Sequence, residues 1–173
     1  MNNPLRSFAA GVVLAALATI PALAAPDALQ GGGTAALKAE AMQAAAQAAV
    51  KTYLSLWTQA PMAVDSAFAD TMVLRYEHAH PQLTSEVRGR PSVVTQVRSV
   101  AKLGTSWSFS NLRVFPTLHD NIYYAQFTAS GKSADGASAI EQEVVISLEM
   151  KGFKVSRLVE FSNPAIRLAI ATP

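Results

Sequence analysis

The sequence predicts one α+β domain in which helices cover one face of a curved antiparallel sheet. Helical spacing of apolar residues is concentrated in the first half of the chain, and strand-like alternation dominates the second half. Helices followed by a run of strands are typical of this fold class. The length of 173 residues suits a single domain with one core.

Three helices are predicted before the run of strands. The first covers residues 35–59, an alanine-rich segment with apolar side chains three and four residues apart, and Thr34 can cap it. A proline at its first turn suits a short second helix over residues 61–68. A third helix opens at residues 89–91 and is expected to end at Gly104 in a left-handed cap.

Five strands are predicted, one of them before the third helix. In residues 72–78, Met72, Leu74, Tyr76 and His78 alternate with polar or smaller residues, which is the period of a half-buried strand. Turn residues separate the later strands, which we expect to form an antiparallel meander. These four cover residues 107–115, 121–131, 140–150 and 153–162.

The N-terminal 24 residues are predicted to be a signal peptide. Arg6 precedes an apolar run over residues 8–20 that is too short to span a membrane and leads to the small-x-small triplet 22–24. We therefore expect cleavage there, a periplasmic or secreted location, and no stable membrane anchor afterwards. The alternative is that residues 5–25 remain as a membrane helix.

After this segment, residues 25–34 are expected to form a flexible tether, because they combine a proline with three consecutive glycines. The single domain then covers residues 35–173.

The composition of the chain excludes several classes of function. The 14 basic and 12 acidic residues are scattered, which disfavours nucleic acid as a partner. The chain has no cysteine, so thiolate chemistry and disulfides are excluded, and it carries no phosphate-loop or dinucleotide-binding motif, so no cofactor is expected.

Four short stretches, taken with the order of the elements, resemble one known superfamily. They are Ala48-Ala49-Val50-Lys51-Thr52-Tyr53-Leu54, Phe68-Ala69-Asp70, Val87-Arg88-Gly89-Arg90, and the closing segment 148–155 that runs on to residues 160–164. In this order they resemble the nuclear transport factor 2-like superfamily, and within it the SnoaL-like and ketosteroid-isomerase-like proteins. The resemblance covers nearly the whole chain after the signal peptide.

The resemblance implies a cone with an apolar cavity between the curved sheet and the first helix. In isomerase-like members, a tyrosine on the first helix and an acid on a late strand donate hydrogen bonds to an enolate oxygen, and an aspartate on the first strand moves the proton. Tyr53 matches the tyrosine. The base position falls on Tyr76 and the acid position on Ile146, with Glu143 on the opposite face, so this sequence departs from the pattern at both carboxyl positions.

His78 is the best acid–base candidate, since the reference pKa of histidine is about 6.5 and the alternation of the strand aims it inward. Alternatively it is a structural histidine at the end of the strand. His78 and His80 form a His-x-His pair, which we interpret as solvated or hydrogen-bonded; no metal site is expected because nothing in the spacing supplies a third ligand.

These observations predict a domain that binds a small apolar molecule. The expected lining residues are Tyr53, Trp57, Leu74, Tyr76, His78, Ile146 and Phe161. The alternative for Tyr53 and Trp57 is plain core packing, which is the more common role of aromatic side chains at helical spacing. One alternative is an isomerase, cyclase or dehydratase with His78 as base and the Tyr53 hydroxyl as oxyanion donor. Another is an envelope interaction module whose own side chains fill the cavity.

The later strands also predict a homodimer. Glu141, Glu143 and Glu149 share one face of their strand with Val145 and Ser147. The resemblance implies that such a mixed apolar and charged face of the sheet serves for dimerisation.

Overall fold

The computed structural model describes residues 28–60, 63–77, 85–133 and 135–162. The predicted signal peptide, His78 and His80 lie outside these residues. The elements are α1 (Ala28–Trp57), α2 (Val64–Ala67), β1 (Phe68–Tyr76), β2 (Glu86–Arg88), α3 (Arg90–Ala101), β3 (Gly104–Pro116), β4 (Ile122–Ser133), β5 (Ala139–Lys151) and β6 (Lys154–Phe161). None of the helices within the described ranges is long and apolar enough to cross a membrane.

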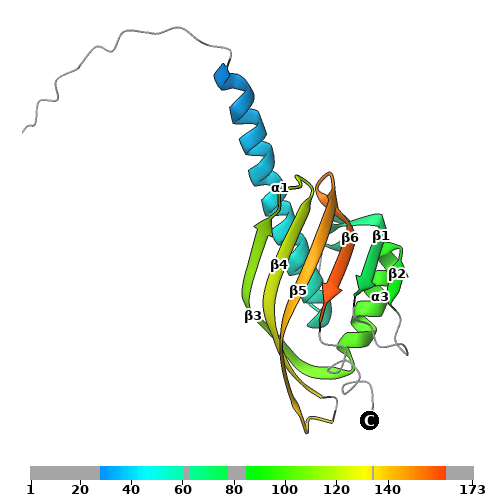
Figure 1. Ribbon diagram of the computed structural model, residues 1–173. Coiled ribbons are helices and arrows are strands. Elements are labelled where there is room, and N and C mark those ends of the chain that lie inside the picture. The colour runs from blue at the N-terminus through cyan, green and yellow to red at the C-terminus, as the bar shows by residue number, and fades with distance from the viewer. Residues whose placement is uncertain (1–27, 61–62, 78–84, 134, 163–173) are drawn as a thin grey trace, which may run out of the picture.

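The six strands form one curved sheet in the order β2-β1-β6-β5-β4-β3 (Figure 1). The antiparallel meander from β3 to β6 is confirmed. The expectation of a wholly antiparallel sheet is corrected, because β1 runs parallel to β6 and the sheet is therefore mixed. This pairing joins the first long strand to the last, so side chains from both halves of the chain meet on one face.

Two irregularities in the β3–β4 pairing bend the sheet. The register shifts between Thr105 and Ser108 and again between Ser110 and Arg113. Ser106 and Asn111, one in each interval, both have a φ of 56°, which is the left-handed region. Bulges of this kind bend a strand and increase its twist. They give the sheet a concave face toward α1.

The core lies between this concave face and the helices. From α1 the buried side chains follow a helical stripe at three- and four-residue spacing, as predicted. From α3, Val93 and Val97 are fully buried. The stripe of α1 consists of Met42, Ala46, Ala49, Val50, Tyr53, Leu54 and Leu56.

The helix boundaries differ from the predicted ones. Helix α1 begins at Ala28, so residues 28–34 of the expected tether have helical backbone and Thr34 lies inside the helix rather than at its cap. Extending an existing alanine-rich helix requires no new nucleation, which offsets the low propensity of the three glycines. Helix α2 is shorter than expected because Phe68 already pairs with Val155 in the sheet.

Gly104 does not cap α3. It is the first residue of β3, and the indole of Trp107 lies so close that an added Cβ would be 2.5 Å from a ring carbon. The same ring covers Gly131 on β4. Trp107 donates a hydrogen bond from Nε1 to the Ala101 carbonyl at 2.9 Å. The glycine is therefore needed for close packing at the end of α3. Strand β2, which pairs with β1, lies inside the segment that was expected to be a polar loop.

Candidate functional site

One row of side chains crosses the concave face at the level where β1 and β6 end. The register aligns these positions on neighbouring strands, and Tyr76, Ile146 and Glu160 are at most 3% exposed. Among the described residues Glu160 is the only buried charged one. From one strand to the next, the row consists of Val114, Ala125, Ile146, Glu160 and Tyr76.

Tyr53 joins this row from α1. Its hydroxyl donates a hydrogen bond to Oε2 of Glu160, and Tyr53 itself has no exposed surface. The backbone carbonyl of Glu160 accepts a hydrogen bond from the Glu77 amide at 3.0 Å. A carboxyl group removed from water is costly unless it is hydrogen-bonded. The Tyr53 hydroxyl therefore offsets part of the desolvation cost of the Glu160 carboxyl, which the surrounding apolar side chains cannot do.

Glu160 lies between the two positions where the resemblance implied carboxyl groups. It is paired across the sheet with Ile146 on β5 and with Tyr76 on β1. The interior thus contains a late-strand carboxyl, one strand away from the expected place. Alternation within β6 was the available signal, because Leu158 is fully buried and Glu160 is two residues further on the same face.

The other predicted lining residues divide into two groups. Leu74, Tyr76 and Ile146 are buried with Tyr53 in the same interior. Trp57 is only partly buried, and its ring meets Trp107 edge-on, with ring centroids 5.2 Å apart and an interplanar angle of 72°.

Phe161 does not belong with the inward-facing residues. In β6 it follows Glu160 directly and pairs with Val145, so the strand register places it on the opposite face of the sheet. The inward residue at this end of β6 is Glu160, which corrects the expected lining. His78, the proposed base, is among the residues that the structure does not describe.

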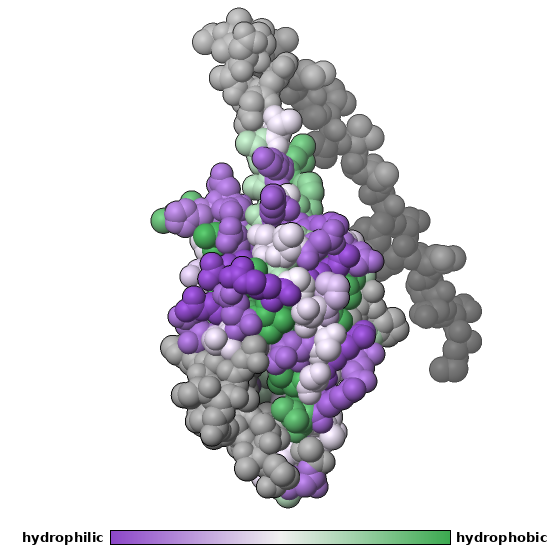
Figure 2. Space-filling view, turned by 90° about the vertical axis from the view of Figure 1, so that its right-hand side faces the viewer, coloured by the Kyte–Doolittle hydropathy of each residue, from purple (hydrophilic) through white to green (hydrophobic). Residues whose placement is uncertain are grey.

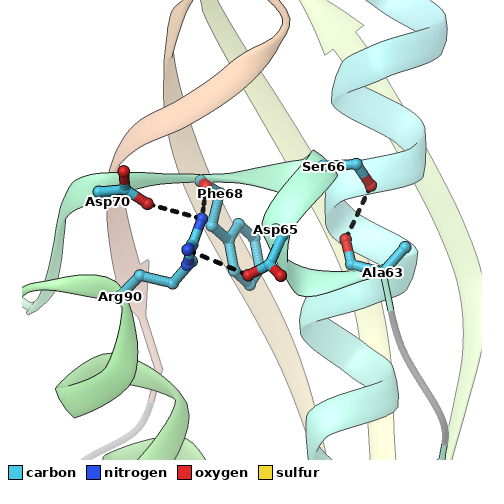
Figure 3. A network of polar contacts seen from close by, with 6 residues as sticks. All are labelled: Ala63, Asp65, Ser66, Phe68, Asp70 and Arg90. Atoms are coloured by element: carbon cyan, nitrogen blue, oxygen red, sulfur yellow. Dashed lines mark hydrogen bonds and ion pairs between the residues drawn. The ribbon is translucent and has the colours of Figure 1, made fainter.

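A second polar cluster lies where α2, β1 and α3 meet (Figure 3). The Arg90 guanidinium contacts Asp65 at 3.0 Å and Asp70 at 2.8 Å, and it donates a hydrogen bond to the Phe68 carbonyl at 3.1 Å. Gly89, with a φ of 85°, positions the arginine at the start of α3. We call these three charged side chains the Arg90 cluster.

The Arg90 cluster explains two of the stretches that carry the family resemblance. The first, Phe68-Ala69-Asp70, supplies two of its acceptors, and the second, Val87-Arg88-Gly89-Arg90, supplies its donor. The side of the molecule that carries β2 and α3 is mostly hydrophilic, with small separate apolar patches (Figure 2). These motifs are thus accounted for by folding contacts at a solvated junction.

A hollow of about 490 Å³ lies between α1 and the β3–β4 turn, lined in part by Lys38, His119, Asp120 and Tyr123. Burial raises the pKa of the Tyr123 hydroxyl above its ordinary value of 10.0, and the negative charge of Asp120 adds to this effect.

Within the described ranges, no three histidine or carboxylate side chains are grouped as a metal site would require.

No known family's sequence profile matches the chain, and no curated protein sequence is similar to it. Solved structures are similar to it in fold. A phenazine biosynthesis-related protein from Pseudomonas aeruginosa is 18% identical, with a TM-score of 0.61 over 78% of this chain and 90% of that one. A nuclear transport factor 2-like protein from Anabaena variabilis is 15% identical, with a TM-score of 0.59 over 71% and 90%.

A third similar structure is a hypothetical protein with a ketosteroid isomerase-like fold from Catenulispora acidiphila, solved in complex with trimethylamine. It is 12% identical, with a TM-score of 0.57 over 72% of this chain and 93% of that one. The chain therefore has the nuclear transport factor 2-like fold that its motifs resembled. At these identities the likeness shows the fold alone.

Proposed function

We propose that this protein is an exported small-molecule-binding domain whose ligand packs on the apolar concave face and hydrogen-bonds to the Tyr53–Glu160 pair. The observation that carries the proposal is the buried carboxyl of Glu160 in a row of otherwise apolar or aromatic side chains. Concave apolar interiors with a few convergent polar groups are the usual form of a ligand site.

Folding alone gives little reason for a carboxyl at this position. Replacing a buried ionic group by apolar residues of similar volume is often neutral or stabilising. The four side chains aligned with Glu160 offer an apolar or aromatic environment in which a leucine would pack well. A binding role supplies the reason that packing does not.

The ligand must reach a floor that is closed. Tyr53, Leu74 and Ile146 have no exposed surface, whereas Trp57 and Phe109 are only partly buried. We infer that the partly buried aromatic rings form the outer part of the site. Binding at Glu160 then requires side chains near the floor to move.

The decisive experiment is native mass spectrometry of protein purified from its own compartment, for the wild type and for Glu160→Gln. We expect a bound small molecule in the wild type and its loss, or at least a tenfold weaker retention, in Glu160→Gln. Glu141→Gln is the matched control, because Glu141 is an exposed residue on the other face of the sheet. Equal retention by all three proteins would overturn the proposal.

Acid–base catalysis is the second candidate, favoured by the hydrogen bond from Tyr53 to Glu160. A carboxylate that accepts a proton from a substrate carbon or oxygen, beside a hydroxyl that turns from the carboxylate to donate its hydrogen bond to the substrate, is the minimum set for an isomerase, cyclase or dehydratase. If the retained molecule exchanges a carbon-bound proton for deuterium in heavy water, and Glu160→Gln abolishes that exchange, the protein is an enzyme.

Export and assembly are part of the same proposal. Removal of the first 24 residues predicts a mature protein that begins at Ala25, which the intact mass of the purified chain tests.

On the outer face of the sheet, Phe115 and Tyr124 pair across β3 and β4 and are each 44% exposed. This exposed aromatic pair favours a homodimer through the sheet, and Tyr124→Lys is expected to yield monomers in sedimentation experiments.

A further inference from the structure

One buried polar atom of the interior has no partner in the part of the chain that the structure describes. The Oε1 atom of Gln142 is inaccessible to solvent and accepts no hydrogen bond, although the residue as a whole is partly exposed. Buried acceptors are nearly always paired in native proteins, so an unpaired one calls for an explanation.

Gln142 lies on the concave face, in line with the proposed site. It shares the face of β5 that carries Val144 and Ile146, and its partner on β4 is the buried residue Ala129. Gln142 is four positions before Ile146, the neighbour of Glu160, which corresponds to about 13 Å along an extended strand. The carboxyl of Glu160 and the amide of Gln142 thus mark two separate levels of one face.

The surface between these levels is apolar. Val144 on β5 pairs with Phe127 on β4, and Phe127 meets Phe109 edge-on with ring centroids 5.8 Å apart. The pairing of β5 with β6 stops at Val145 and Phe161, so Gln142 lies in the part of the β4–β5 hairpin that extends beyond β6 (Figure 1). Among the residues that the structure describes, no strand pairs with that edge of β5 at Gln142.

We propose that Gln142 is the second polar contact of the ligand, and that the ligand is an elongated, mainly apolar molecule with hydroxyl or amino donors at opposite ends. This proposal rests on the proposed function. Both ends of the interior present acceptors, since Glu160 already receives the Tyr53 hydroxyl and the amide oxygen of Gln142 can only accept. A hydrogen-bond donor at each end of the ligand satisfies both acceptors. The rings of Phe109 and Phe127 then contact the apolar middle of the ligand.

The two acceptors predict which compounds the site binds most tightly. A site built to hydrogen-bond a hydroxyl discriminates strongly against an analogue that lacks it, because the protein group is then left unpaired. Compounds with one polar end should therefore bind through Glu160 and gain nothing from Gln142.

The test uses two matched probes, 4,4′-dihydroxybiphenyl and its monomethyl ether, with binding followed by the fluorescence of the tryptophans near the site or by calorimetry. We expect the wild-type protein to bind the diol about tenfold more tightly than the ether. Gln142→Met preserves the approximate size of the side chain and removes the acceptor, and it should abolish this preference by weakening only the diol. Glu141→Gln is the control with unchanged affinities.

The outcomes separate this proposal from the proposed function. If Gln142→Met leaves the preference for the diol intact while Glu160→Gln weakens both probes, the role of Gln142 is refuted and the binding site stands. If the compound retained by the native protein has no donor at one of its ends, the role of Gln142 is likewise refuted. If the wild type binds neither probe and retains no compound, the proposed function itself fails.

Discussion

The two polar clusters of this protein, the Tyr53–Glu160 pair and the Arg90 cluster, differ in what surrounds them. Both join segments that are distant in the sequence. The Arg90 side chain is 21% exposed and its two aspartates are 89% and 83% exposed, so water shares in solvating their charges. Glu160 is 3% exposed and Tyr53 not at all. The Arg90 cluster therefore costs little to form, whereas the Tyr53–Glu160 pair requires desolvation of a carboxyl group.

This difference separates structure from function. Arg90 connects α2, β1 and α3 through three contacts at one guanidinium, which is sufficient reason for its presence. The Tyr53–Glu160 pair fills a place where apolar side chains would pack. Removing a cluster that stabilises the fold should lower the free energy of unfolding. A functional cluster should be replaceable by apolar residues without loss of stability.

The largest effect is expected for Tyr53→Phe, which removes the hydroxyl that solvates Glu160. Removing a hydrogen-bond donor from a buried carboxyl should lower the free energy of unfolding by about 3 kcal/mol. The double variant Tyr53→Phe with Glu160→Leu should recover the wild-type value or exceed it, because both polar groups are then gone. Urea denaturation of the two variants measures the difference. A double variant less stable than Tyr53→Phe alone would assign the pair to folding.

A smaller loss is expected for Arg90→Met, about 2 kcal/mol, since the Phe68 carbonyl loses a charged donor. Arg90→Lys should restore only part of this, because an ammonium group cannot make the forked contacts to two carboxylates. Ligand retention measured by native mass spectrometry should stay at the wild-type level in folded Arg90→Lys. Loss of ligand in that variant would contradict the structural role.

A still smaller change is expected for Asp65→Asn, because Asp65 is 89% exposed and its pairing with Arg90 is screened by water and salt. The change in melting temperature should be small and should shrink further in 1 M sodium chloride. A large and salt-independent effect would show that the Arg90 cluster is less solvated than its exposure indicates.

The smallest effect concerns Glu143 on the outer face, where a third set of polar contacts is fully exposed. Hydrogen bonds from Gln126 at 3.0 Å and, second, from Thr128 at 2.9 Å hold the pKa of Glu143 below its ordinary value of 4.5. A carboxyl with a lowered pKa in the folded state stabilises the fold above its unfolded pKa and loses that contribution as the pH falls through the folded value. Carbon-13 NMR titration should find a higher pKa in Gln126→Met than in the wild type, with an unchanged value in Gln142→Met.

The sequence by itself determined every element except β2, and the inward faces of α1 and β1. Alternation in β1 placed Leu74 and Tyr76 inside, helical spacing placed Tyr53 inside, and the turns of the meander followed from glycine and aspartate chemistry. These features are local, since each depends on residues a few positions apart. Helix α1 could also be predicted, but its start could not, because propagation from a stable segment overrides the preference of Gly31 to Gly33.

Only the tertiary structure decided which polar groups meet. Tyr53 and Glu160 are 107 residues apart, and they meet because α1 packs against β6. Alternation in β6 could have placed Glu160 inward, although Phe161 was expected there instead, and no local pattern specifies the partner strand or its register. Pairing between distant strands is set by how all the apolar faces pack together. The contact of the Glu160 carboxyl with Tyr53 therefore follows from the whole fold and not from any single segment of the chain.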